Sequence, residues 1–543
     1  MRSDAAFQHV SRRTFLGLVG VGVAGAALAG ASGLPSPFDF VAGPTVALAE
    51  GTDTVIVYAK GDPMSWCPDM TADDNAYNPV QNMFHRLTKL DASKKAIPDA
   101  AESWDVSDNA KTITFHLRKD LAWSDGEPLT SADVVYTFQT IHDNPAYYLS
   151  ATLSTVESFE APDDYIVVFN MKSPDMSIVS TIGWYAGFIL PQHVYDNGKD
   201  WGENDAAKLT GTPVTSGPYR LVEYRQGQSI TLEANESYYQ VPKIKRLVYS
   251  IIADPSTSVQ ALQNAEIDYL DNVPSSSVTT LQADPSLKLV LNEYPSPVRM
   301  IYNLQRTERH IDDLAVRQAI AMCIDRESIA QKAYAGVMKP ETHFYPSLYA
   351  EYSNDVDVTP GYDPAGARAL LEQAGYEADA DGYFIRGLTI DVFTSAGYDE
   401  CAKLICADLA TAGMECSVVV SESSAFSEKV GQRHDFDLEI QSGFMGPDAF
   451  ALKNRFGTGT ASNYGSYSNE EFDALCDEAN ATADEAKRAE LYKQAQTILA
   501  QDLPYVPICA YASYDGYAAN LINVPNDGTD KWGWQEWTYA EWA

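Results

Sequence analysis

The stretch at residues 388–420 constrains the fold more than any other part of the chain. Residues 388–394 and 416–420 have the composition of strands, and residues 398–412 between them form a helical pattern that ends at Gly413. The two connections are short, which implies a right-handed crossover and parallel strands. The pattern therefore predicts an α/β fold.

A second strong signal is a β-hairpin within residues 212–240. Leu221 precedes a tight turn at residues 226–228, and Leu232 follows it. A chain of 543 residues is too long for one ordinary core, so two or three domains are expected. The position of the hairpin decides how those domains are arranged.

The hairpin follows a segment, residues 90–209, that has the pattern of a small α+β domain. Strands are expected at residues 111–118 and 164–170, and Thr130 and Asp133 predict a capping box for the helix between them. The hairpin is therefore interpreted as the return to an earlier domain.

The N-terminus carries a targeting signal. Residues 11–16 (SRRTFL) have the twin-arginine signature, a run of Gly, Ala, Val and Leu follows, and residues 47–49 (ALA) suit a signal peptidase. We predict a twin-arginine signal peptide over residues 1–49 and export to the periplasm or the extracellular face of the cell envelope. An uncleaved membrane anchor is the alternative, because the apolar run is nearly long enough to span a bilayer.

The net charge of −37, from 75 acidic and 38 basic residues, argues against nucleic acid and against an anionic membrane surface as partners. The 32 tyrosines are typical of proteins that hold a polar ligand between partly apolar walls. None of the seven cysteines forms a Cys-x-x-Cys motif, although Cys401, Cys406 and Cys416 are spaced for local bridges.

No stretch has the pattern of a catalytic, metal or cofactor site. The eight histidines are scattered, and there is no Gly-x-Ser-x-Gly elbow and no phosphate-binding Gly-Lys-Ser/Thr loop. A pair of carboxylates that catalyses glycoside hydrolysis stays an alternative, because acidic residues are abundant. We therefore expect a binding protein with no catalytic residue, metal or cofactor, and keep a secreted hydrolase as a remote alternative.

Six blocks of sequence, taken in order, carry a resemblance to a known family. They are residues 97–138 (IPDAAESWDVSDNAKTITFHLRKDLAWSDGEPLTSADVVYTF), 215–224 (TSGPYRLVEY), 261–270 (ALQNAEIDYL), 314–336 (LAVRQAIAMCIDRESIAQKAYAG), 362–375 (YDPAGARALLEQAG) and 488–507 (RAELYKQAQTILAQDLPYVP). The chain resembles the bacterial extracellular solute-binding proteins of the peptide/nickel class, which serve ABC importers. The resemblance extends over nearly all of residues 53–543.

The resemblance implies a two-lobed periplasmic-binding-protein fold (type II, large three-domain form) with a hinge. The implied parts are lobe one at residues 53–88, 211–295 and 508–543, an inserted α+β domain at 89–210, and lobe two at 296–507. A small solute would bind between the lobes and favour the closed form, which docks on the permease subunits of a transporter with cytoplasmic ATPases. A monomer is expected.

The resemblance also informs the choice of ligand. Dipeptide and oligopeptide binders of this class carry an aspartate for the peptide ammonium where this chain has Gly443, so Asp448 or another acid would have to replace it. The arginine that dipeptide binders place just before the helix at Tyr398 has no counterpart either. An oligopeptide held by backbone hydrogen bonds is therefore favoured over a dipeptide. A nickel chelate or an oligosaccharide stays open, as does a sensory role without a transporter.

The candidate ligand-binding residues follow from their positions in this scheme. Asp62 and Trp66 lie in the loop after the first strand, and Arg299 and Tyr302 lie on the hinge strand. Phe444, Met445 and Asp448 lie in the lobe-two loop, and Tyr464 follows that loop. Arg299 is expected to pair with a ligand carboxylate.

Overall fold

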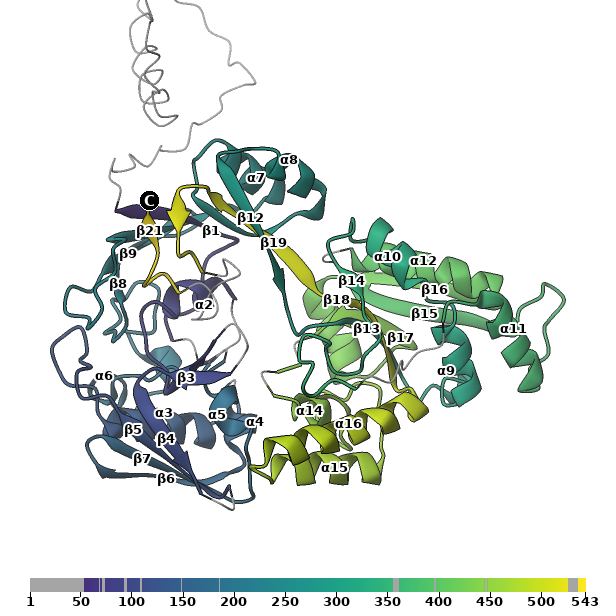
Figure 1. Ribbon diagram of the computed structural model, residues 1–543, viewed down its shortest axis with the longest axis horizontal. Helices are drawn as coiled ribbons and strands as arrows, with labels where there is room; N and C mark the ends of the chain where they lie inside the picture. Colours follow the sequence, from purple (N-terminus) through teal and green to yellow (C-terminus); the bar gives the residue numbers. More distant parts are fainter. Residues whose placement is uncertain are drawn as a thin grey trace, which may run out of the picture.

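The computed structural model describes residues 53–543, except residues 68, 71–73, 92–94, 108–109, 148, 185, 355–360, 395–396, 444, 447 and 526–535. The predicted signal peptide lies outside the described residues. Figure 1 shows two separate bodies joined by extended chain. We call the body around the seven-stranded sheet lobe one, the four-stranded sheet next to it the inserted domain, and the body around the six-stranded sheet lobe two. The residue boundaries proposed for these parts stay predictions.

The sheet of lobe one is built around a central parallel strand. β1 (Thr54–Ala59) lies between β10 (Arg246–Ile251) and β11 (Tyr269–Val273) and runs parallel to both. The remaining strands, in antiparallel pairings, are β8 (Tyr219–Arg225), β9 (Ser229–Ala234), β12 (Leu287–Glu293) and β19 (Ala512–Ala518). Side chains of β1 alternate between two cores. Val55 and Val57 join the large core shared with the inserted domain, and Ile56 packs under the helices α7 (Pro255–Gln263) and α8 (Val278–Gln282).

The hairpin predicted around residues 226–228 is confirmed as β8 and β9. Gly217, just before it, contacts the chain so closely that a Cβ atom there would lie 2.6 Å from the carbonyl carbon of Met83. The helix α2 (Asp74–Val80) contains Pro79 in its last turn, where a proline removes only one backbone hydrogen bond.

The inserted domain is an antiparallel sheet covered by helices. Its strands are β4 (Ala101–Val106), β5 (Thr112–Leu117), β7 (Ile166–Met171) and β6 (Val156–Asp163), in that order. Its helices are α3 (Ser131–Asp143), α4 (Ser150–Leu153), α5 (Ile178–Thr181) and α6 (Gln192–Tyr195). The capping box of α3 is confirmed, since the Thr130 amide donates to the Asp133 carboxylate at 2.9 Å. A small ladder of β2 (Thr88–Leu90) and β3 (Ala96–Pro98) lies between this sheet and lobe one.

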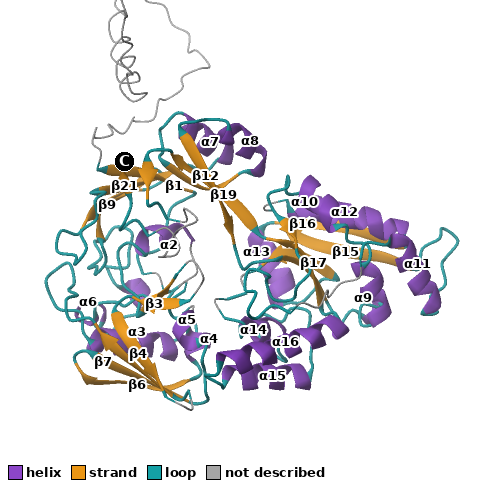
Figure 2. Ribbon diagram, viewed as in Figure 1, coloured by secondary structure: helices purple, strands orange, loops and turns teal. Residues whose placement is uncertain are grey.

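Lobe two contains the predicted strand–helix–strand unit. β15 (Ile385–Phe393) and β16 (Met414–Ser421) are parallel neighbours joined by α12 (Tyr398–Thr411), which confirms the prediction. The sheet also contains β13 (Val298–Tyr302), β14 (Lys339–Pro340), β17 (Leu438–Ser442) and β18 (Tyr505–Ala510). Figure 2 shows the helices gathered around this sheet. They are α9 (Leu314–Ala321), α10 (Arg326–Lys332), α11 (Pro364–Gln373), α13 (Ser423–Phe426), α14 (Ala451–Phe456), α15 (Glu470–Asn480) and α16 (Glu485–Asp502).

The helix α15 begins after Asn469, whose side chain accepts hydrogen bonds from the backbone amides of Glu471 and Phe472. The sulfur atoms of Cys406 and Cys416 face each other at 2.9 Å between α12 and β16, and all seven cysteines are unbridged.

Two extended segments connect the lobes side by side. One leads from β12 into β13 and the other from β18 into β19, and the Tyr294 amide donates to the Tyr511 carbonyl at 3.0 Å between them. Beside this crossing, an ion pair of 2.8 Å joins Glu293 of lobe one to Lys339 of lobe two. The lobes are thus held at one edge by paired backbone.

A second contact joins the two bodies far from the crossing (Figure 1). The Asn480 side chain, at the end of α15, donates to Asp175 of the inserted domain at 3.0 Å, and the Met176 amide donates to the Asn480 carbonyl at 3.1 Å. Both polar side chains are buried. The space between the lobes is therefore bounded by contacts on two sides.

Replacing Asn480 with Ala tests this second contact. Asp175 loses a buried donor, so we expect the free energy of unfolding to fall by about 1 kcal/mol, measured by urea-induced unfolding. The control is Glu478→Ala on the same helix, whose ion pair with Lys487 is exposed and should contribute little. Equal stability of the two variants would contradict the contact.

Candidate functional site

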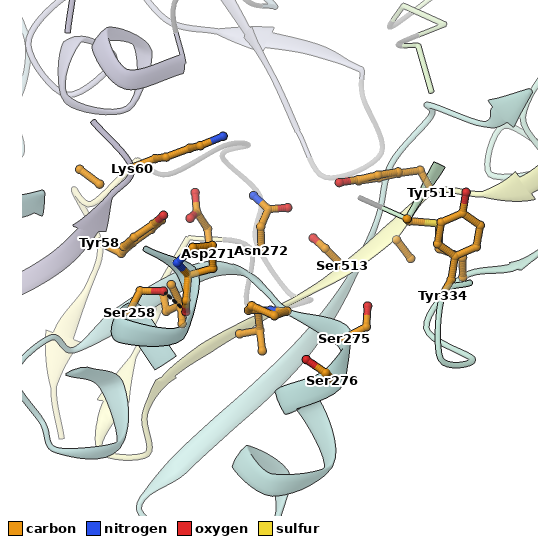
Figure 3. Close-up of a pocket in the computed structure, with 18 of the residues that line it drawn as sticks. Tyr58, Lys60, Ser258, Asp271, Asn272, Ser275, Ser276, Tyr334, Tyr511 and Ser513 are labelled. Atoms are coloured by element: carbon orange, nitrogen blue, oxygen red, sulfur yellow. Dashed lines mark hydrogen bonds between the residues drawn. The ribbon is translucent and has the colours of Figure 1, made fainter. Parts of the chain in front are cut away.

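A cavity of 690 Å³ lies between the lobes, next to the crossing segments. Lobe one supplies most of its wall, and the second crossing segment supplies Tyr511 (Figure 3). Lobe two supplies Ala333, Tyr334, Met338 and Gly397. The volume is within the range of small-molecule sites, roughly 300–1,000 Å³. A ligand in this cavity would contact both lobes at once.

The topology of lobe one explains why the cavity is there. β1 runs parallel to β10 on one side and to β11 on the other, and the chain leaves each strand at the same edge of the sheet. Lys60 directly follows β1, Pro255 begins the helix after β10, and Asn272 lies near the end of β11. Ligands of open α/β sheets bind at this edge, beyond the carboxyl ends of the parallel strands.

The lining is polar and rich in tyrosine. Burial and the nearby carboxylates of Asp271 and Asp254 raise the pKa of Tyr58 to about 12, and burial is the main reason that the pKa of Tyr511 is raised to about 12. Their hydroxyl groups therefore stay protonated at neutral pH and can donate hydrogen bonds. Such walls can bind a ligand through both ring faces and hydroxyl groups.

The wall from lobe two is formed by the start of α12. Gly397 has φ +78°, and a Cβ atom there would lie 2.9 Å from the Ala333 carbonyl oxygen. The next residue, Tyr398, donates to the Ser442 hydroxyl at 2.7 Å and so joins this wall to β17. The close approach requires glycine at position 397.

Asp62 and Trp66 lie in lobe one beside the hairpin. The Asp62 carboxylate accepts from the Tyr224 hydroxyl at 2.8 Å and from the Gly227 amide at 2.7 Å. Trp66 is fully buried, with its ring edge-on to that of Tyr224. Both side chains hold the loop after β1 in place, and the ligand contact predicted for them stays a prediction.

Arg299 and Tyr302 lie on β13, in the interior of lobe two. Tyr302 is fully buried and donates to the Arg317 carbonyl at 3.0 Å. Arg299 is also fully buried, and one of its nitrogen atoms donates to the Gly443 carbonyl at 3.0 Å. A Cβ atom at Gly443 would lie 2.3 Å from the guanidinium of Arg299, so a side chain at this position would collide with that group. Pairing of Arg299 with a ligand carboxylate stays a prediction.

The remaining candidates lie in or near the loop that follows β17. Met445 is fully buried, and its amide donates to the Pro295 carbonyl at 2.8 Å, which joins the loop to the crossing. Asp448 is buried and pairs with Arg488 at 2.6 Å. Tyr464 is partly buried near the ring of His434, and Phe444 lies outside the described residues. Their roles toward a ligand stay predictions.

The cavity also contains residues that the sequence analysis did not single out. Of the seven predicted site residues that the structure describes, none is among those that line it, whereas Lys60, Asp271, Tyr334 and Tyr511 are. A signal was present for Asp271, because Asn272 and Pro274, which are residue types common in turns, follow it closely in the sequence. Tyr334 follows a helix in lobe two, and only the tertiary structure brings it to the cleft.

Among the described residues, no group of three or more His, Cys, Asp or Glu side chains is arranged to hold a metal ion. No helix in the same part of the chain has the length and apolar character needed to cross a membrane.

Comparisons with known proteins agree with this architecture. A profile of the family described as bacterial extracellular solute-binding proteins, family 5 (middle), matches residues 95–464. The dipeptide-binding protein of Escherichia coli is 28% identical over 500 residues, which cover 85% of this chain and 90% of the relative.

Solved structures confirm the predicted two-lobed α/β fold of the periplasmic binding proteins. Oligopeptide-binding AppA from Bacillus subtilis, in complex with a nonapeptide, has a TM-score of 0.76 and 25% identity over 90% of this chain and 99% of that one. NikZ from Campylobacter jejuni, in complex with Ni(L-His), has a TM-score of 0.73 and 20% identity over 90% and 98%.

Replacing Asp448 with Ala tests its structural role. The substitution leaves the buried guanidinium of Arg488 without its carboxylate, so the free energy of unfolding should fall by about 3–5 kcal/mol, measured by urea-induced unfolding. Asp205→Ala is the control, because its ion pair with Lys208 is exposed and its loss should leave the unfolding midpoint unchanged. A similar unfolding midpoint for both variants would show that the buried ion pair contributes no more to stability than the exposed one.

The buried Glu439 of β17 makes stability depend on pH. Burial raises the pKa of this carboxyl from 4.5 to about 7, although a hydrogen bond from Gln441 and the charge of Arg299 oppose the shift. A raised pKa favours the neutral form in the folded protein. The stability that the neutral Glu439 carboxyl contributes is therefore fully present below about pH 4.5 and is lost as the pH rises to about 7.

Glu439→Gln should remove this dependence, because the amide has no proton to lose. Relative to the wild type, the variant should gain about 3 kcal/mol in free energy of unfolding between pH 4.5 and pH 8, measured by urea-induced unfolding at each pH. Glu236→Gln, at an exposed position, is the control. A stability difference that is the same at both pH values would refute the prediction.

Proposed function

This chain belongs to family 5 of the bacterial extracellular solute-binding proteins, and we propose that it is the exported substrate-binding subunit of an ABC importer. It captures a small solute, in our proposal an oligopeptide, between its two lobes and delivers it to the permease subunits. The twin-arginine signal at residues 1–49 directs it across the cytoplasmic membrane. It works as a monomer, without enzymatic activity.

The observation that carries this proposal is that one cavity takes its walls from both lobes. Tyr58 and Asp271 reach it from lobe one, whereas Tyr334 and Gly397 reach it from lobe two. A ligand that contacts both walls binds the closed form better than the open form, and so shifts the equilibrium toward closure. The paired crossing segments are the hinge of this motion.

The chemistry of the walls supports a peptide as the ligand. Hydroxyl and amide side chains around the cavity, among them Asn75, Asn78, Ser258 and Ser513, match the alternating donors and acceptors of a peptide backbone. The relatives also favour a peptide, since the E. coli protein is a dipeptide-binding protein and the AppA structure contains a nonapeptide.

The eight residues predicted from the sequence stay proposed ligand-binding residues, and the contacts of five of them also hold loops in place. Asp62 and Trp66 fix the loop after β1, and Arg299, Met445 and Asp448 fix the loop after β17. Loops held in this way keep the wall in shape while the lobes move. Tyr302, Phe444 and Tyr464 complete the proposed set in lobe two.

Thermal unfolding of the mature protein tests the ligand class. A casein digest of short peptides should raise the unfolding temperature, because a ligand at 100 times its Kd adds about 2.7 kcal/mol. Ser276→Trp, which places a large ring at the cavity wall, should abolish the rise, whereas Ser424→Trp on an exposed part of lobe two should retain it. A rise only with Ni-histidine or with an oligosaccharide would overturn the peptide assignment. Mass spectrometry should show the bound peptides uncleaved, as expected for a binding protein.

A further inference from the structure

We propose that Asp271 of lobe one binds the ammonium group of the ligand, so that the cavity selects peptides with a free amino terminus. This inference rests on the proposed peptide-binding function and adds the residue that anchors one end of the peptide. It places the anchor in lobe one, opposite the lobe-two loop in which the family resemblance locates it.

The backbone around Asp271 is shaped to bring this carboxylate into the cavity. The pairing of β11 with β19 is regular up to Leu270 and shifts register before Val273, so that Asp271 and Asn272 form a bulge. Asn272 has φ +48°, in the left-handed region. A bulge re-aims side chains at the edge of a site. Figure 3 shows Asp271 between Tyr58 and Asn272 at the cavity wall.

A buried carboxylate holds the bulge in place. Asp515 of β19 is fully buried and accepts from the Asn272 amide at 3.0 Å, from the Tyr269 hydroxyl at 2.7 Å and from the Asn292 side chain at 2.7 Å. These bonds connect three strands to the bulge. The position of Asp271 is therefore set by the rigid sheet, as suits a group that must meet a ligand at a fixed point.

The surroundings of Asp271 favour a cation. It is the one carboxylate among the described residues that line the cavity, and its negative charge contributes to the raised pKa of Tyr58, Tyr249 and Tyr511. An ammonium group near a carboxylate and the faces of tyrosine rings is stabilised by both. Lys60 shares the cavity wall but is exposed, so its flexible side chain can turn to solvent when an ammonium arrives.

The acids that the sequence analysis considered for this role are placed differently. A side chain at Gly443 would collide with the guanidinium of Arg299, and the carboxylate of Asp448 is paired with Arg488 in the interior of lobe two. Neither position lines the cavity. Asp271 is the acid that does.

The test compares two ligand pools and three proteins. The pools are a casein digest and the same digest after acetylation of its amino groups, and the proteins are the wild type, Asp271→Asn and the control Asp164→Asn. Asp164 is exposed in the turn before β7, so the control removes the same charge far from the cavity. The measurement is the peptide concentration that gives a fixed rise in unfolding temperature.

For the wild type and Asp164→Asn, acetylation should raise that concentration about tenfold or more, because a charge-assisted hydrogen bond is lost. For Asp271→Asn the two pools should differ by less than about threefold. Equal binding of both pools by the wild type, or a full preference retained by Asp271→Asn, overturns the anchor while leaving peptide binding intact. Failure of the wild type to bind either pool overturns the proposed function and the anchor together. If Asp271→Asn does not fold, the comparison of the two pools on the wild type still tests whether the cavity selects peptides with a free amino terminus.

Discussion

The parallel pairing of β1 with β10 and β11 is the interaction on which the rest of the molecule depends. It joins residues 54–59 to residues 246–251 and 269–273 across nearly two hundred positions of intervening chain. The hairpin of β8 and β9 extends the same sheet, which explains why the chain returns there after the inserted domain. Because the three parallel strands end at one edge, their following residues form the lobe-one wall of the cavity.

Two contacts between the bodies define the state in which the cavity exists. Backbone pairing at Tyr294 and Tyr511 fixes one edge, and the buried contact between Asp175 and Asn480 fixes another. The first consists of continuous chain and can act as a hinge, whereas the second involves two separate surfaces and can break. In the proposed function, a bound solute and the second contact would both favour the arrangement seen in this structure. This fits the solute-binding role of the family.

Buried charge in lobe two has a structural role close to the site. Asp448 and Arg488 neutralise each other, and Arg299 fills the space beside Gly443. Breaking either arrangement leaves a charge in the interior, which is costly. Gly443 and Asp448 are therefore held by contacts within lobe two. In the proposal above, the charge of the ligand is met by a residue on the cavity wall.

The sequence by itself determined the elements and the class of fold. Periodicity and caps located the hairpin, α3 and the β15–α12–β16 unit, because these depend on neighbours close in the chain. The ordered blocks of residues indicated the family. Only the tertiary structure decided which side chains face the cavity. Trp66 and Arg299 are at the expected places in the chain but are enclosed by protein, whereas Asp271 is brought to the cavity by a bulge. The burial of a side chain depends on strands far apart in the sequence, and no local pattern records it.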